Sequence, residues 1–143
     1  MKKLILLFIL ACISIRGFAQ IPYIQWQLPI GGSALDEGRH IIQNPDSSYV
    51  VIGVSASNDS DVSGNHGGYD YWVAKLTPSG SIIWQKSYGG SSMDGGNCIR
   101  STFDGGYIVA GSSRSTDGDV TGNHGMHDYW VIKLSATGAI MWQ

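Results

Sequence analysis

A repeat of 58 residues constrains this chain more than any other feature of its sequence. Trp26, Trp84 and Trp142 are spaced at this interval, and residues 26–83 match residues 84–141 at 29 of 58 positions. Repetition at a fixed period is typical of proteins that stack copies of one structural unit. A repeat copies every residue, whereas an active site is usually assembled once. The repeat therefore favours a structural or binding role over catalysis.

Each unit is predicted to form four antiparallel β-strands. Apolar and aromatic runs bounded by Gly, Pro, Asn, Asp or Ser are typical of strands, and no stretch shows sustained helical periodicity. The strands are expected at residues 39–43, 49–55, 71–76 and 82–88, and again at 97–101, 107–113 and 129–134, with a last strand running to Gln143. A leading strand is expected at residues 24–28, which match the fourth strand of a unit.

The apolar pattern predicts how these strands pack. The second strand is apolar on both faces, as expected of a strand that is covered from both sides. The third strand places Trp72 on one face and Tyr71 on the other, because side chains alternate along a strand. Aromatic residues at strand spacing could form a sugar-stacking platform, but packing between units is the more common role. We therefore expect the tryptophans in the core, with Tyr71 and Tyr129 partly exposed.

The fold class that follows is all-β, with tandem four-stranded antiparallel units that resemble propeller blades. Propellers close with about four to eight blades, so two units and a leading strand make only an incomplete propeller. The favoured interpretation is a fragment of a longer array, in which further 58-residue repeats follow Gln143. The alternative is that two-unit chains assemble into a ring.

The first 19 residues have the pattern of a secretory signal peptide. Lys2 and Lys3 precede an apolar run at residues 4–15, and small residues lie before a cleavage point after Ala19. The run is short for a membrane span, so a retained anchor is the weaker alternative and no membrane insertion is expected after cleavage. Residues 20–143 would then form a secreted or cell-surface protein with two repeats, at about 26–83 and 84–141.

Charge and cysteine content narrow the partners of the mature chain. Cleavage leaves six basic residues against 11 acidic ones, a net charge of −5, which gives no indication of nucleic acid or an anionic membrane as partner. Cys98 is then the single cysteine, so no intramolecular disulfide is expected. It is interpreted as a buried strand residue rather than a nucleophile, because no activating base stands near it in the sequence.

A long polar loop in each unit carries the best candidate for metal chemistry. Residues 59–70 and 117–128 partly match the calcium-loop pattern D-x-[DN]-x-[DN]-G-x₅-E, in which oxygen ligands converge around a sharp glycine turn. The candidate calcium ligands are Asp59, Asp61, Ser63, Asp70, Asp117, Asp119, Thr121 and Asp128. The competing interpretation is that these side chains cap backbone N–H groups in turns. If Ca²⁺ binds, a dissociation constant of about 10⁻⁴–10⁻³ M is expected.

Four segments together resemble a family of secreted bacterial repeat proteins. They are W-Q-K-S-Y-G-G-S at residues 84–91, D-G-G-Y-I-V-A-G at 104–111, D-G-D-V-T-G-N-H-G at 117–125 and D-Y-W-V-I-K-L at 128–134. The resemblance implies a β-propeller exported through type IX secretion. It also implies an extracellular location and a non-catalytic binding or scaffold role.

No Ser/His/Asp set, phosphate loop or Cys–His pair is present, so no catalytic residues are predicted. The first functional hypothesis is a non-enzymatic extracellular repeat module for binding or adhesion to a protein or glycan. The alternative is a carbohydrate-binding or carbohydrate-processing accessory domain, such as an endoglucanase-like one. Repeated histidines, His66 and His124, are interpreted as hydrogen-bonded loop residues rather than zinc ligands, since zinc needs three or four converging ligands.

Overall fold

The computed structural model describes residues 21–143, and this part of the chain is all-β. It forms two four-stranded antiparallel sheets, with the spatial orders β1-β2-β3-β4 and β5-β6-β7-β8. The strands are β1 (Asp36–Gln43), β2 (Tyr49–Ser55), β3 (Asp70–Leu76), β4 (Ile82–Tyr88), β5 (Asp94–Ser101), β6 (Tyr107–Ser113), β7 (Asp128–Leu134) and β8 (Ile140–Trp142). The predicted signal peptide lies outside the described residues.

The expected strands are present, with two differences. β1 and β5 begin three residues earlier than predicted, because the Asp and Gly residues at their starts resemble a turn in the sequence yet pair with the ends of β2 and β6. The predicted leading strand at residues 24–28 is wrong, since this segment is irregular in the structure. Its repeat counterparts pair with β3 and β7, and within the described chain no such strand precedes it.

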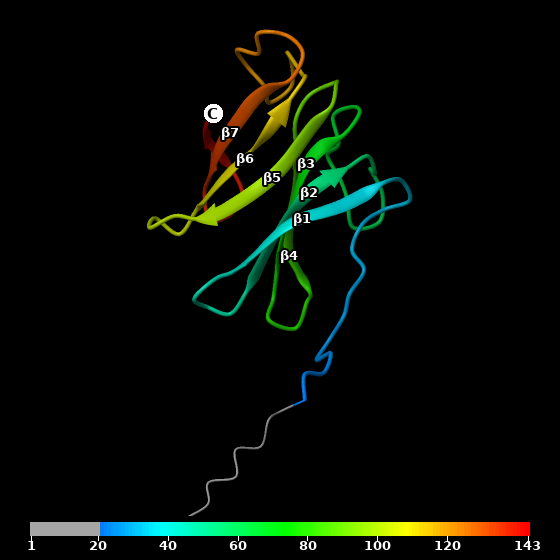
Figure 1. Ribbon diagram of the computed structural model, residues 1–143, viewed down its shortest axis with the longest axis vertical. Coiled ribbons are helices and arrows are strands. Elements are labelled where there is room, and N and C mark those ends of the chain that lie inside the picture. Colours follow the sequence, from blue (N-terminus) through cyan, green and yellow to red (C-terminus); the bar gives the residue numbers. More distant parts are fainter. Residues whose placement is uncertain (1–20) are drawn as a thin grey trace, which may run out of the picture.

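The short connections follow from local turn chemistry. β5 and β6 are joined by Thr102–Gly106, where Gly105 adopts a φ of 78° that glycine accepts without strain. The Thr102 N–H donates a hydrogen bond to the Gly106 carbonyl at 2.9 Å, which closes the hairpin. The hairpins lie at the opposite end of each sheet from the long loop between its second and third strands (Figure 1).

The first sheet has two apolar faces. The front face of the first sheet carries Tyr49, Val51, Trp72, Ala74 and Leu76, and its back face carries Val50, Ile52, Val54, Tyr71 and Val73. The back face packs on the front face of the second sheet, so that β5 lies against β1, β2 and β3 (Figure 1). This contact, which we call the joint, contains the main hydrophobic core. Two open sheets stacked in this way form an incomplete propeller-like arrangement.

The tryptophans of the third strands serve packing, as predicted, but the burial of several other residues differs from the prediction. Trp72 and Trp130 are buried, and each indole N–H donates to a glutamine side chain, Gln85 or Gln143, at 2.8 or 2.9 Å. Trp26 and Trp142, at the two ends of the described chain, are 40% and 52% exposed instead of lying in the core, and Cys98 is only partly buried. Tyr71 is not partly exposed, as the sequence suggested, but completely buried in the joint. Alternation along β3 correctly placed it opposite Trp72, but the strand pattern cannot indicate that a second sheet covers that face.

Candidate functional site

The paired acids at the start of each long loop hold a neighbouring backbone segment. Asp59 accepts a hydrogen bond from the Ser33 N–H at 2.8 Å, and Asp61 accepts one from the Gly31 N–H at 3.2 Å. The Asp61 N–H in turn donates to the Gly31 carbonyl at 3.2 Å. Hydrogen bonds from Ser33 hold the pKa of Asp59 below its usual value.

The second unit repeats this arrangement. Asp117 accepts from the Ser91 N–H at 2.7 Å, and Asp119 accepts from the Gly89 N–H at 3.3 Å. The Ser91 hydrogen bonds lower the pKa of Asp117. Both pairs of carboxylates therefore fasten the Gly-Gly-Ser segment that enters each sheet, which is a structural task and explains why the sequence repeats them.

The last acid of each loop pairs with the repeated histidine. Asp70 accepts hydrogen bonds from the His66 backbone N–H and ring Nδ1, both at 2.8 Å. Asp128 has the same two partners on His124, at 2.6 and 3.0 Å. The interpretation of these histidines as hydrogen-bonded loop residues agrees with this geometry.

The two hydroxyl-bearing candidates are each hydrogen-bonded to a glutamine, Ser63 through its side chain and Thr121 through its backbone. Ser63 Oγ accepts a hydrogen bond from Gln85 Nε2 at 2.6 Å, and the Thr121 N–H donates to Gln143 Oε1 at 3.1 Å. Among residues 21–143, no group of three or more His, Cys, Asp or Glu side chains is placed to hold a metal ion. As placed, the predicted ligands do not form the converging oxygen set that calcium requires. Calcium binding stays a prediction, which metal removal tests.

Two carboxylates that the sequence did not pair meet inside the joint. Asp70 and Asp94 are both completely buried, and the Oδ1 atom of each has no hydrogen-bond partner. Both lie against Gly89, where an added Cβ would be 2.6 Å from Asp94 Oδ2 and 2.7 Å from Asp70 Oδ1. Burial raises the pKa of Asp70, and the nearby Asp94 adds to the effect. The pKa of Asp128, the partly exposed counterpart of Asp70, is instead lowered by its hydrogen bonds to His124.

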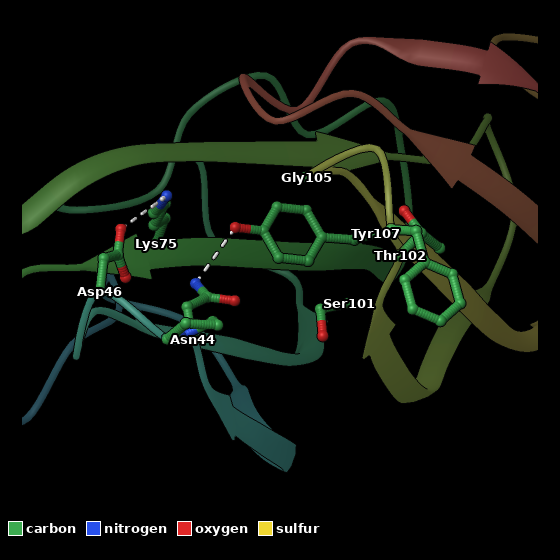
Figure 2. A pocket seen from close by; sticks show the side chains of 9 residues that line it. Asn44, Asp46, Lys75, Ser101, Thr102, Gly105 and Tyr107 are labelled. Carbon is green, nitrogen blue, oxygen red and sulfur yellow. Dashed lines mark hydrogen bonds and ion pairs between the residues drawn. The ribbon is translucent and has the colours of Figure 1, made fainter.

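A cavity lies where the two units meet at their hairpin end (Figure 2). It has a volume of about 520 Å³ and is bordered by one hairpin from each unit. We call it the hairpin groove. Its lining residues are Asn44, Pro45, Asp46, Lys75, Ser101, Thr102, Phe103, Gly105 and Tyr107.

The hairpin groove combines polar groups that bond to one another with two aromatic side chains. The Asn44 amide donates to the Tyr107 hydroxyl at 3.2 Å across the two units, and Lys75 Nζ lies 3.9 Å from Asp46 Oδ2 (Figure 2). Phe103, at the tip of the β5–β6 hairpin, is fully exposed. Tyr107 by contrast is buried and forms the floor.

The hairpin groove was not predicted from the sequence, although a signal was available. Phe103 replaces Pro45 of the first unit, and the tip of a turn gains nothing structurally from an exposed phenylalanine. The second side of the groove comes from a hairpin 58 residues earlier, which only the stacking of the units brings near.

No protein-family model matches the chain, and no curated protein matches it. The described residues contain no helix with the length and hydrophobicity that a membrane crossing requires.

Proposed function

We propose that this chain is a non-catalytic, exported β-propeller-type repeat module that binds an extracellular partner, at the cell surface or after secretion. The hairpin groove is the observation that carries this proposal. It joins an exposed aromatic ring to amide, hydroxyl and charged groups in one hollow between two units. Binding sites typically combine apolar walls with a few fixed polar groups in this way.

The acids of the long loops support the same conclusion. Their carboxylates hold backbone N–H groups at 2.7–3.3 Å in both units, so they act as structural elements of the repeat. A glycosidase would instead need two free carboxylates that flank a bound sugar. The repeated Asp residues therefore do not favour the carbohydrate-processing alternative.

The carbohydrate-binding alternative has its own support in the composition of the hairpin groove. The apolar face of a sugar ring can stack on Phe103, while its hydroxyl groups can bond to the Asn44 amide and the Thr102 hydroxyl. A groove with this mixed lining fits an extracellular glycan at least as well as a peptide. We accordingly propose a glycan as the first ligand class to examine.

A glycan-array screen of the purified chain tests this proposal, with Phe103→Ala as the groove variant. Tyr129→Ala is the matched control, since Tyr129 is also an almost fully exposed aromatic residue but lies away from the hairpin groove. We expect a glycan signal that Phe103→Ala abolishes and Tyr129→Ala retains. Equal binding by both variants would show that the hairpin groove is not the site. Hydrolysis of a β-glucan that an Asp variant abolishes would replace the binding proposal with an enzymatic one.

A further inference from the structure

The joint shows what contact between two units requires. Tyr71 is 0% exposed there, its ring meeting that of Trp130 edge-on at a centroid distance of 4.8 Å. Its hydroxyl donates a hydrogen bond to the Trp130 carbonyl at 3.0 Å. The ring lies over Gly96, where an added Cβ would be 3.1 Å from Tyr71 Cγ. An aromatic side chain of one unit thus fills a seat formed by a glycine and a tryptophan of the next.

The second sheet carries the same back face without a cover in the described chain. Tyr129, the repeat counterpart of Tyr71, is 97% exposed. Val131, the counterpart of the fully buried Val73, is 38% exposed. We call this surface of β6 and β7 the open face. Its tyrosine already has the backbone position that buries Tyr71, and lacks only a neighbouring sheet.

The front of the first sheet carries a matching seat. A cavity of about 240 Å³ opens there, and its lining includes Gly38, Gly53 and Trp72. We call it the socket. The repeat counterparts of these three residues are the ones that surround Tyr71 in the joint, namely Gly96, Gly111 and Trp130. The socket is therefore the seat of a tyrosine that the described residues do not supply.

Gly38 provides an independent indication that the socket accepts a side chain. Within residues 21–143, no atom other than its immediate neighbours lies within 4 Å of a Cβ added at Gly38, and its φ is not in the positive region. Neither space nor backbone conformation in the described chain requires a glycine there. At the counterpart position Gly96, a Cβ would meet Ile52 Cδ1 at 2.6 Å and the ring of Tyr71. A tyrosine that enters the socket would exclude a side chain at Gly38 in the same way, and would explain why this position is a glycine.

We propose that a second copy of this chain docks head to tail, so that Tyr129 of one copy enters the socket of the next. The contact continues the joint already present between the two units. By repeat equivalence, the Tyr129 hydroxyl then donates to the Trp72 carbonyl. A head-to-tail contact joins two different surfaces and closes into a ring when the rotation allows it. Because each copy adds two sheets, a ring of about four to eight sheets corresponds to about two to four copies.

The end segments of the two copies meet in this contact. Trp26 packs on Tyr49 at a centroid distance of 5.8 Å, as Trp84 packs on Tyr107 at 6.2 Å. Docking would bring Trp142 of the incoming copy to the place of Trp26, so one of them must yield. β8 pairs with β7 at only two register positions, Lys133↔Trp142 and Leu134↔Ile140. We expect β8 of the incoming copy to detach from β7, so that Trp26 keeps its place.

The contact between copies should be weaker than the joint within a copy. The open face has Ala110 and Ser112 where the buried face has Ile52 and Val54. Smaller and more polar side chains remove less apolar surface from water. Association is therefore expected to depend on concentration, with the Tyr129 contact as its main anchor.

Sedimentation velocity over a range of chain concentrations tests this proposal. The wild-type chain should shift from one copy to two or more as concentration rises. Tyr129→Ala removes the inserted side chain and Gly38→Val fills the socket, so each variant alone should stay monomeric. Phe103→Ala, which removes an exposed aromatic residue outside both surfaces, should associate as the wild type does. Circular dichroism would confirm that all variants are folded.

A mixture of the two defective variants separates head-to-tail docking from other modes of association. Tyr129→Ala keeps an intact socket and Gly38→Val keeps an intact Tyr129, so the mixture should form a dimer that neither variant forms alone. It should grow no further, because the remaining ends of that dimer are both defective. A wild-type chain that stays monomeric throughout, association unaffected by either variant, or a mixture that forms no dimer would each overturn the proposal.

Discussion

Truncating Tyr71 tests whether the joint stabilises the fold as the structure indicates. A tyrosine that is fully buried removes about 150–250 Å² from water, which corresponds to about 4–6 kcal/mol at ~25 cal/mol per Å². Residual compactness of the unfolded chain lowers this figure, and measured truncations of buried aromatic residues cost about 3–5 kcal/mol. We expect Tyr71→Ala to lower the free energy of unfolding by about 4 kcal/mol. Tyr71→Phe, which removes only the hydrogen bond to Trp130, should cost about 1 kcal/mol.

Tyr129→Ala is the matched control, because the same residue at the same place in the repeat is 97% exposed. We expect its effect to stay within about 0.5 kcal/mol. Urea unfolding followed by tryptophan fluorescence measures all three variants, at a concentration low enough to keep the chain monomeric. Equal losses for Tyr71→Ala and Tyr129→Ala, or a loss below about 1 kcal/mol for Tyr71→Ala, would refute the stacking of the two sheets.

Four further predictions concern packing at the joint, two carboxylates and calcium. Gly96→Val should destabilise the fold by about 1–3 kcal/mol through overpacking against the joint, whereas Gly38→Val should leave the melting temperature of the monomer unchanged. Hydrogen bonds from Lys133 and Thr102 lower the pKa of Asp104, so its stabilising effect is present above about pH 4 and is lost as pH falls. The difference in unfolding free energy between wild type and Asp104→Asn should therefore be largest near neutral pH and should disappear in acid. Burial raises the pKa of Asp70, so Asp70→Asn should gain stability relative to wild type as pH rises through that pKa. Thermal melting with and without EDTA tests the calcium prediction, since bound Ca²⁺ would raise the melting temperature and chelation would lower it.

Much of the fold was predictable because strand signals are local. β2, β4 and β6 have the predicted bounds, since each apolar run is flanked by turn residues that end it. The early starts of β1 and β5 were missed, because Asp94-Gly95-Gly96 favours a turn by composition and becomes a strand only by pairing with β6. At residues 24–28 the error is the opposite one, because a strand was predicted and none is present. It has the composition of a strand but lacks a partner strand within the described chain.

The candidate site was less predictable than the fold. The repetition of the loop acids is evident in the sequence, but the sequence could not decide between metal ligands and backbone caps. That choice depends on which atoms come within about 3 Å, and the partners of Asp117 lie 26 residues away, at Ser91. The hairpin groove and the buried Asp70–Asp94 pair were both missed, because each combines residues from two different units.

The sequence by itself determined the repeat, the all-β class and the alternation of side chains along each strand, since these depend on short-range spacing. Only the tertiary structure decided the environment of each copy. Tyr71 and Tyr129 have nearly the same local sequence, yet one is fully buried and the other almost fully exposed. Asp70 and Asp128 likewise have pKa values shifted in opposite directions. The physical reason is that burial and desolvation depend on the neighbouring sheet, and the first unit has a neighbour on its back face where the second, in the described chain, has none.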